Sequence, residues 1–494
     1  MAATLFWHDY ETFGADPKRD FPVQFGGIRT DLAFNIIGQP VTWYCRPPLD
    51  YLPDPQACAV TGITPYEAQS KGVNEIEFAR LIHDELAQPD TCTVGYNNLR
   101  FDDEVTRHLL YRQFYDPYTR EYQHNNSRWD LLDVLRMAYA LRPEGIQWPA
   151  KVKDNVSVPS FRLEDLTQAN GIEHGQAHDA LADVYATIAM ARLLSEKQPK
   201  LYHFLYRLRM KAECLQWLNS QTDKMFLHTP GMYAVEHACT SPVVLIGQNL
   251  HNRNQYWLYD CRQNPDELLD SSVELIKARL FTPKDQQTQE RFGIKGIQMN
   301  KCPALAPIGV LTQTSRERLQ WQSVFEQHAQ RLIKYRHELL PKLQQVFAYT
   351  EDDVPETIGY AESRLYAGFI SGQDKTLQQT LCQADIEQRV RAITAKPDGV
   401  FSDERYNELL FLQLGRLQRL PTALQAIWNQ HVDDKLNTGI NHSRTYTQYF
   451  EAIQQIQAEH PNLAKTLTNY GQEHLKKTNA LFGRINPSFD SATN

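Results

Sequence analysis

Two carboxylates separated by a single residue lie in the first strand-like stretch of the chain. Asp9 and Glu11 belong to the apolar run LFWHDYETF, and side chains two positions apart on a strand point to the same face. Buried carboxylates repel one another unless a cation lies between them, and oxygen-rich sites suit Mg²⁺ or Mn²⁺. The pair is therefore a candidate metal site, although one carboxylate in solvent at a strand end would give the same spacing.

A third acidic residue follows a second strand-like run. The stretch VGYNNLRFD leads from a predicted strand through a turn to Asp102, near the start of a predicted helix. An aspartate at that position commonly caps free backbone N–H groups. Asp102 is therefore a candidate for either helix capping or metal binding.

A histidine and an aspartate five residues apart complete the candidate set. Residues five apart on an ideal helix are separated by about 140°, so His178 and Asp183 cannot share one helix face. The spacing predicts His178 in a loop and Asp183 in the first turns of the helix that follows. An imidazole at a pocket mouth suits a general base and a fixed carboxylate suits a metal ligand, but a histidine at a helix start is more often structural.

The elements that must position these residues follow an α/β pattern over residues 1–198. LFWHDYETF and DTCTVGYNN are predicted strands. The predicted helices are FDDEVTRHLLYRQF, RWDLLDVLRMAYAL and HDALADVYATIAMARLLSE. The charged, proline-containing stretch EKQPK predicts the end of this domain.

Two further zones follow in the sequence. Residues 199–350 open with the helical LYHFLYRLRMKAECLQWL and continue with runs such as SPVVLIGQNL and QYWLYDC, which predict a small β-domain. Residues 351–494 are helical in pattern, as in QRVRAI, RYNELLFLQLGRLQRL and YTQYFEAIQQIQAEH. We expect residues 482–494 to form a frayed end.

Composition restricts the class of protein. The 494 residues exceed the roughly 250–300 residues that one core supports, so several domains are expected. A net charge of −8 argues against coating of nucleic acid by bulk positive charge, but it is compatible with a nuclease that has a local basic groove. No secretory signal and no run of ~18 apolar residues is present, so a cytoplasmic protein without a membrane span is expected. The eight cysteines include no CxxC pair, and we expect reduced thiols in the core.

The three acidic segments together resemble the motifs of the DEDDh exonuclease superfamily, whose domain has a ribonuclease-H-like fold. They read D-x-E, N-N-x-x-F-D and H-x-x-x-x-D in chain order. Longer stretches resemble the bacterial exonuclease I family over nearly the whole chain: HDYETFGADPKRDFPVQFGGIRTD, LRPEGIQWP, PSFRLEDLTQANGIEHGQAHDALADVYATIAMAR, NKCPALAP and YAGFIS.

This resemblance implies a role for each candidate residue. Asp9, Glu11, Asp102 and Asp183 match the family's four acidic metal ligands, and His178 matches its general base. Two Mg²⁺ ions, which Mn²⁺ can replace, would flank the scissile phosphate. The implied activity is processive 3′→5′ hydrolysis of single-stranded DNA to 5′-mononucleotides, in DNA repair and recombination.

The resemblance also implies the architecture. Residues 1–198 would form a ribonuclease-H-like α/β exonuclease domain, 199–350 an SH3-like β-domain and 351–494 a C-terminal helical domain. The latter two would close over the DNA of a monomeric enzyme. A threaded strand then slides between cuts, and a duplex does not fit.

Substrate contacts are expected near the metal strand and in the other two domains. Beside Glu11, Thr12 and Phe13 could hold the terminal nucleotide, although Phe13 is equally compatible with the core. Arg162 could reach a phosphate. Lys224 and Ser371 match groove positions of the family, with a solvated surface lysine as the alternative for Lys224.

The family also binds the acidic, Phe-ending C-terminal tail of single-stranded-DNA-binding protein, in a pocket beside the nuclease domain. Arg142 matches one basic position of that pocket, and Arg316 and Arg318 are candidate companions. Phe204 stands where the family has a tyrosine at the pocket wall.

Two other functions remain compatible with the motifs. An RNA 3′-end trimming exonuclease would carry the same five residues, but such enzymes are little more than the nuclease domain. An inactive nucleic-acid-binding module would be expected to lose at least one of the five, and all are present.

Overall fold

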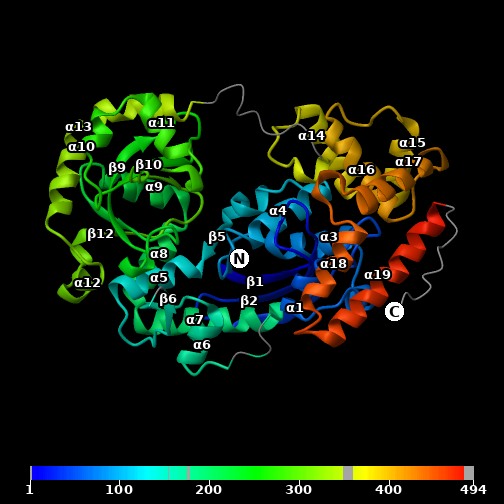
Figure 1. The fold of residues 1–494 in the computed structure, drawn as a ribbon, viewed down its shortest axis with the longest axis horizontal. Helices are drawn as coiled ribbons and strands as arrows, with labels where there is room; N and C mark the ends of the chain where they lie inside the picture. The colour runs from blue at the N-terminus through cyan, green and yellow to red at the C-terminus, as the bar shows by residue number, and fades with distance from the viewer. Residues whose placement is uncertain (1–2, 154, 174, 176–177, 349–359, 483–494) are drawn as a thin grey trace.

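The computed structural model describes residues 3–153, 155–173, 175, 178–348 and 360–482. The mixed sheet of the first region lies in the lower middle of Figure 1, with the second region on one side of it and the third region on the other. Of the expected frayed end, residues 482–494, all but Phe482 lie outside the described residues.

The first region is built around β1, the strand that carries Asp9 and Glu11. Its sheet has the order β3-β2-β1-β4-β5, in which β1 pairs antiparallel with β2 and parallel with β4. The bounds are β1 Thr4–Thr12, β2 Pro22–Thr30, β3 Ile36–Tyr44, α1 Pro55–Thr61, α2 Pro65–Lys71, α3 Glu75–Leu86, β4 Thr91–Gly95, α4 Asp102–Arg112, β5 Ser127–Asp130, α5 Leu131–Leu141, β6 Ala150–Lys153, β7 Val156–Pro159, α6 Leu163–Ala169 and α7 Ala180–Lys197. Because helices cover both faces, β2 and β4 are buried almost throughout.

One element of the first region differs from the sequence prediction. The segment RWDLLDVLRMAYAL was predicted to be a single helix, but its start belongs to β5, and α5 begins only at Leu131. Asp130 separates the two, since its side chain accepts the backbone N–H of Leu132 as the helix N-cap. The apolar period alone gave no sign of the parallel pairing with β4.

The second region contains an antiparallel sheet with the order β11-β10-β9-β8-β12. Helices flank this sheet, and α13 packs along β9. The bounds are α8 Pro199–Leu208, α9 Lys211–Ser220, β8 Phe226–His228, β9 Ser241–Gln248, β10 Gln255–Asp260, α10 Asp266–Asp270, α11 Val273–Phe281, β11 Ile294–Gln298, β12 Leu305–Pro307, α12 Gln313–Arg318 and α13 Val324–Val346. One hydrophobic core joins Trp7 and Val94 of the first region to Phe226 and Leu305 of the second.

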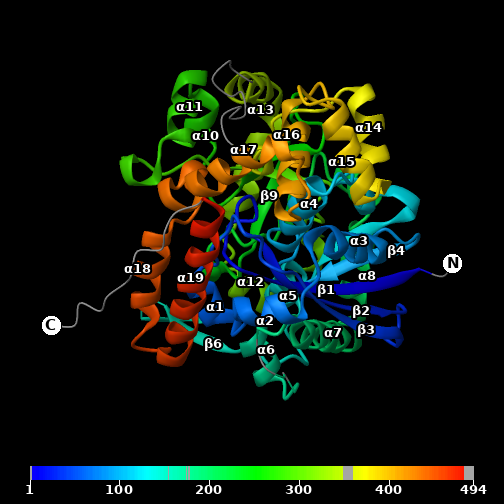
Figure 2. The ribbon, with the colours of Figure 1, turned by 90° about the vertical axis from the view of Figure 1, so that its right-hand side faces the viewer.

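The third region is helical among its described residues, in agreement with the apolar period. Its bounds are α14 Gly372–Gln383, α15 Ile386–Ala395, α16 Glu404–Arg416, α17 Thr422–Asp433, α18 Tyr446–Ile456 and α19 Pro461–Leu481. α18 and α19 pack against α1, and α19 also contacts α2 (Figure 2). No described helix is long and apolar enough to span a bilayer.

A buried network of charges also joins the third region to the first. Arg416 of α16 donates to both oxygens of Asp50, at 2.9 and 2.7 Å, and to both oxygens of Glu362. Lys435 donates to Asp50 at 2.8 Å. Burial alone would raise the pKa of Asp50, but Arg416 and Lys435 outweigh it and hold the pKa well below its usual range.

Asp50→Asn should destabilise the protein by about 3–5 kcal/mol, because Arg416 and Lys435 lose the compensating charge. Urea denaturation followed by circular dichroism measures the change. Glu67→Gln, which breaks the exposed Lys71–Glu67 pair, is the matched control and should cost less than about 1 kcal/mol. The stabilisation by Asp50 is present above its ordinary pKa of 3.8 and is lost as the pH falls, so the two proteins should converge in acid. Equal stability of Asp50→Asn and wild type at neutral pH would contradict this role.

Candidate active site

The carboxylate cluster is assembled where β1 meets the start of α4. Asp102 is the first residue of α4, and its Oδ1 accepts the backbone N–H of Tyr10 at 3.0 Å. This hydrogen bond fixes Asp102 beside the strand that carries Asp9 and Glu11. The N-cap position of α4 is Phe101, and the Asp102 carboxylate accepts its own backbone N–H as well as that of Tyr10.

His178 and Asp183 reach the same place from the start of α7. His178 lies in a turn with a left-handed backbone, φ 66°, and Asp179 is the N-cap of α7. Asp183 follows in the first turn. One carboxylate oxygen each from Glu11 and Asp183 and one ring nitrogen of His178 lie within 4.8 Å of one another. The five-residue spacing allows this because His178 stands before the helix.

The acids of the cluster are one another's neighbours. Burial raises the pKa of Glu11 to about 9, assisted by Asp183 and Asp102. Burial also raises the pKa of Asp102, to about 7, and it raises that of Asp9 well above its usual range with help from Asp102 and Glu11. Burial and mutual repulsion therefore favour the protonated form of these carboxyls unless a cation replaces the protons.

Asp103, the residue next to Asp102, is a buried carboxylate whose charge is balanced by arginines. Its side chain is fully buried, and its two oxygens each lie 2.7 Å from an arginine, Arg120 and Arg128. Burial opposes ionisation, but the two arginines hold the pKa of Asp103 below its usual range. The donor set around Asp102 is instead oxygen-rich and anionic, which fits a hard divalent cation.

The residues expected to contact the substrate differ in how close they lie to the candidate active site and in how buried they are. Arg162 lies at the mouth of the site, where it pairs with Glu164 at 2.9 Å, and Glu164 is 3.6 Å from the His178 ring. Thr12 donates its hydroxyl to the carbonyl of Gly14. Phe13 is fully buried in a core cluster, which favours the core alternative for its ring.

Lys224 and Ser371 belong to the second and third regions. Lys224 is exposed in the turn between α9 and β8, as expected for a solvated lysine. Ser371 is the N-cap of α14 and accepts the backbone N–H of Asp374 at 3.1 Å. The structure does not gather either residue into the carboxylate cluster.

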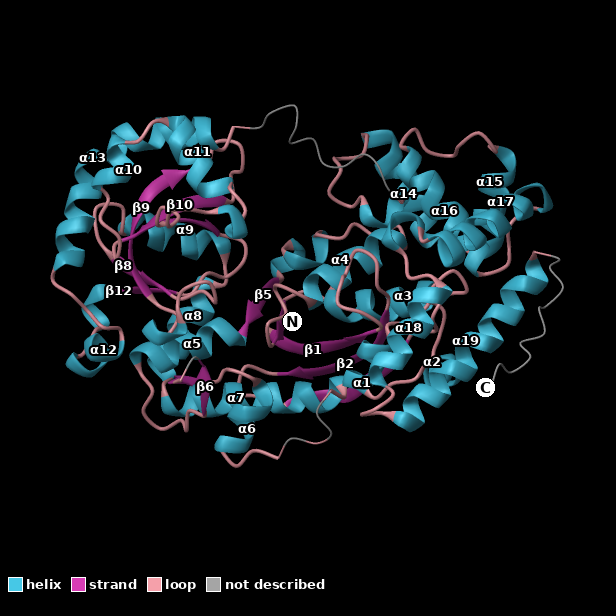
Figure 3. Ribbon diagram, in the orientation of Figure 1, coloured by secondary structure: helices cyan, strands magenta, loops and turns pink. Residues whose placement is uncertain are grey.

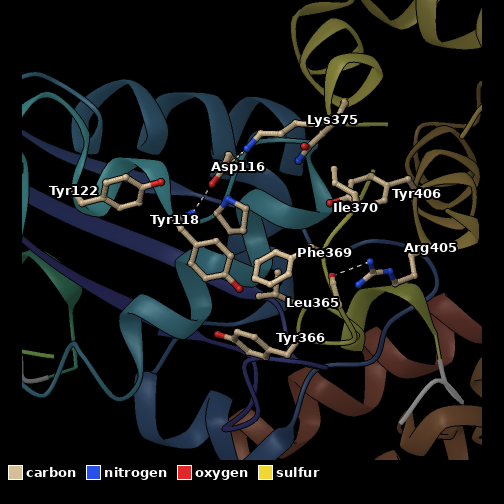
Figure 4. Close-up of a pocket in the computed structure, with 13 residues that line it drawn as sticks. Asp116, Tyr118, Tyr122, Leu365, Tyr366, Phe369, Ile370, Lys375, Arg405 and Tyr406 are labelled. Carbon is tan, nitrogen blue, oxygen red and sulfur yellow. Dashed lines mark hydrogen bonds and ion pairs between the residues drawn. The ribbon is translucent and has the colours of Figure 1, made fainter. Parts of the chain in front are cut away.

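Exposed aromatic side chains near the boundary of the first and third regions were missed by the sequence analysis. Two adjoining hollows share Tyr118, Tyr122, Tyr366 and Phe369. Phe369 is fully exposed, and its ring lies near Tyr118 and Tyr366 (Figure 4). The sequence contains a signal for them, since Tyr366 and Phe369 belong to YAGFIS, the same stretch as Ser371.

The larger of the two hollows is a basic groove. It has a volume of about 970 Å³ and receives cations from the first and second regions: Arg107, Arg128, Arg209, Lys211 and Lys301. Arg128 is held by Asp103 and Glu121. Lys301, by contrast, is 44% exposed and 4.0 Å from its acidic neighbour Glu104.

A separate apolar hollow collects two of the residues expected to bind a partner. Arg142 and Phe204 line it together with Lys200, Pro307 and Val310. Arg142 donates to the Val310 carbonyl at 2.7 Å.

The other two expected partner residues lie outside the lining of that hollow. Arg318 donates to the carbonyl of Ala140 at 3.1 Å, and the Arg316 guanidinium lies over the ring of Trp321. Both belong to α12, which packs against α5.

Comparison with known proteins gives consistent matches along the chain. Residues 6–191 match the family model described as Exonuclease, 209–349 the Exonuclease I SH3-like domain and 360–474 the Exonuclease I C-terminal domain. Exodeoxyribonuclease I of Escherichia coli (strain K12) is 42% identical over 87% of this chain and 89% of its own length. The fold therefore comprises an exonuclease domain, an SH3-like domain and a C-terminal helical domain.

Two solved structures extend the comparison. The zinc-bound form of an E. coli exonuclease I complex with single-stranded DNA matches with a TM-score of 0.86 and 39% identity. A complex of exonuclease I with SSB-Ct matches with a TM-score of 0.85 and 37% identity. Each match covers 96% of this chain and 100% of the other.

Mn²⁺ should raise the thermal midpoint more at about pH 9 than at about pH 6. Without a cation, the folded protein keeps protons on Glu11 and Asp102 that the unfolded chain releases, so its stability falls as the pH rises from the ordinary carboxyl pKa toward about 9. A bound cation relieves the repulsion and displaces these protons. Differential scanning fluorimetry with and without Mn²⁺ measures the effect, and Glu11→Gln should reduce it. An equal shift at both pH values would exclude these carboxyls as the ligands.

Proposed function

The chain belongs to the exonuclease I family of 3′→5′ single-strand exonucleases, and we propose that the carboxylate–histidine cluster of β1, α4 and α7 is its active site. The observation that carries the proposal is the set of buried acids whose neighbours are other acids. Such a set is costly without a cation and is suited to holding one. We place the protein in the cytoplasm, in DNA repair and recombination, where 3′ ends of single strands arise.

The proposed ligands of the divalent cations are the four carboxylates Asp9, Glu11, Asp102 and Asp183. We propose two Mg²⁺ ions, for which Mn²⁺ can substitute. When bound, they supply positive charge at the scissile phosphate and acidify the attacking water. The chain itself holds the carboxylate oxygens in place. The backbone N–H of Tyr10 donates a hydrogen bond to Asp102, and Asp183 is fixed in the first turn of α7.

His178 is the proposed general base. Its ring is 38% exposed, so it can meet a water that enters with the substrate, and it lies within 4.8 Å of Glu11 and Asp183 oxygens. Glu164, at 3.6 Å, would stabilise the imidazolium that forms when the ring accepts the proton from water. Water attack at the last phosphodiester then releases a 5′-mononucleotide and leaves a new 3′ end.

The basic groove with its exposed aromatic rings is the proposed path of the single strand. Rings of Tyr122, Tyr366 and Phe369 can stack on bases of any sequence. Lys211 and Lys301 are better candidates for phosphate contacts than Arg128, whose acidic partners already hold it. Because all three regions supply lining residues, the strand would be held on several sides, which favours sliding over dissociation.

The apolar hollow at Arg142 is the proposed site for the acidic tail of single-stranded-DNA-binding protein. Leu141, Leu201, Phe204 and Pro307 give an apolar wall for a terminal phenylalanine ring. Arg142 donates from one terminal nitrogen to the Val310 carbonyl and from the other to the Leu141 carbonyl, which orients the guanidinium and leaves its remaining N–H groups for a carboxylate.

The purified protein should shorten 5′-labelled single-stranded DNA from its 3′ end only when Mg²⁺ or Mn²⁺ is present. Duplex DNA and RNA should be degraded far more slowly.

Asp183→Ala should abolish cleavage but retain binding of the single strand, since the groove is unchanged. His178→Asn, which tolerates the left-handed backbone, should slow turnover by about 10²–10⁴-fold. Faster trimming of RNA would support the RNA-processing alternative, and wild-type rates in His178→Asn would remove His178 from the mechanism.

Phe369→Ala should weaken binding of single-stranded DNA by about 5–100-fold, because one stacking platform is lost. Fluorescence anisotropy with a labelled oligonucleotide measures the affinity. Phe281→Ala is a matched control, since Phe281 is an exposed aromatic residue at the end of α11 that lies against Phe347. Equal affinities of wild type and Phe369→Ala would rule out this groove as the path.

A fluorescent peptide with the acidic, Phe-ending tail should bind the wild type, and Arg142→Ala should weaken it by about 10–100-fold. Added salt should also weaken binding, because the contact is charge-assisted. Arg316→Ala should have the smaller effect, since Arg316 lies over Trp321 and outside the lining of the hollow. Unchanged affinity in Arg142→Ala would place the tail elsewhere.

A further inference from the structure

A glutamine of β2 lies between the strand that carries Asp9 and Glu11 and the helix that carries Asp183. Gln24 is 1% exposed and stands opposite Glu11 in the β1–β2 ladder. Directly opposed residues of an antiparallel pair project to the same face of the sheet. α7 packs along β1 and β2 (Figure 3).

The carboxamide of Gln24 is fully engaged at the start of α7. Its Oε1 accepts the backbone N–H of Ala180 at 3.0 Å, and its Nε2 donates to Asp179 Oδ2 at 3.0 Å. Nε2 also donates to the Tyr44 hydroxyl at 2.9 Å. The opposite amide orientation would set an oxygen against a carboxylate and an N–H against an N–H, so the network itself fixes the assignment.

Two further contacts tie the same junction to β2. Asp179 Oδ1 accepts the N–H of Ala182 at 3.1 Å, so one side chain both caps α7 and receives the bond from Gln24. Gly26 stands opposite Asp9, and a Cβ there would lie 2.6 Å from the backbone of Ala180 and Leu181. The first turn of α7 therefore rests directly on the backbone of β2.

We infer that Gln24 is a positioning residue for the exonuclease reaction, acting through Asp179 and Ala180 on the segment that carries His178 and Asp183. The inference rests on the proposed active site. β2 is hydrogen-bonded to the strand of Asp9 and Glu11, so a carboxamide that joins β2 to α7 sets the distance between the two halves of the cluster. Misplacement of such groups by about 1 Å can lower a rate about 100-fold.

Exchange of donor and acceptor between Gln24 and Asp179 tests the inference. Gln24→Glu sets a carboxylate against Asp179 and keeps the acceptor for Ala180, whereas Asp179→Asn sets two amide donors against each other and keeps the cap. Each should lower kcat on single-stranded DNA by about 10–100-fold, with KM changed by less than about twofold. The double variant restores the hydrogen bond in the reverse direction and the local net charge. Its kcat should return to within about threefold of wild type.

Two more variants separate positioning from folding. Asp179→Ser retains an N-cap oxygen but is too short to reach Gln24, so kcat should fall while the thermal midpoint changes little. Gln413→Glu changes another buried glutamine, one that contacts Arg389 and the Arg112 carbonyl of the α4–α16 junction. It should leave kcat within about twofold of wild type even where stability changes.

The outcomes distinguish the inference from the function on which it rests. A wild-type protein without metal-dependent cleavage of single-stranded DNA would overturn the proposed function. An active wild type with unchanged kcat in Asp179→Asn and Asp179→Ser, or a double variant whose loss equals the product of the single losses, would overturn only the role of Gln24. Asp179→Ser decides the question if Gln24→Glu does not fold.

Discussion

Repulsion among four neighbouring carboxylates, two of them buried and two half-buried, is the constraint on which this structure depends. Asp9, Glu11, Asp102 and Asp183 come from a strand and two helices, and each raises the free energy of ionising another. The fold must therefore hold them together against their own electrostatics. It does so with contacts of the uncharged backbone. The Tyr10 N–H donates a hydrogen bond to Asp102, and the start of α7 packs closely on Gly26.

The neighbours Asp102 and Asp103 show how partners, more than burial, determine what a carboxylate can do. Both are almost completely buried at the start of one helix. Asp103 is neutralised by Arg120 and Arg128 and so stabilises the fold. Asp102 has no such cationic partner, and burial raises its pKa, which suits its proposed role as a metal ligand. Burial alone therefore does not separate the two residues.

The parts of the site that sequence could predict are those set by local geometry. The alternation of a strand places Asp9 and Glu11 together, and the helical period places His178 before α7. The remainder depends on contacts between distant segments. Nothing local distinguishes Phe13 as core, joins Gln24 to Asp179 across 155 residues, or brings Phe369 beside Tyr118. For the same reason, the sequence did not reveal that the first residues of RWDLLDVLRMAYAL form a strand paired with β4.

The contacts that attach the third region also fix the segment that carries Tyr366, one of the aromatic residues of the groove. Arg405 of α16 donates to the carbonyls of Arg364 and Gly368, which bracket Tyr366, and Tyr366 itself donates to Glu104 of α4. Glu362, a few residues earlier, belongs to the charge network of Asp50 and Arg416. The aromatic segment is thus fixed at both ends before any strand arrives. A preformed stacking surface loses less conformational entropy on binding, so along the proposed path more of the energy of each base contact would remain to hold the strand between cuts.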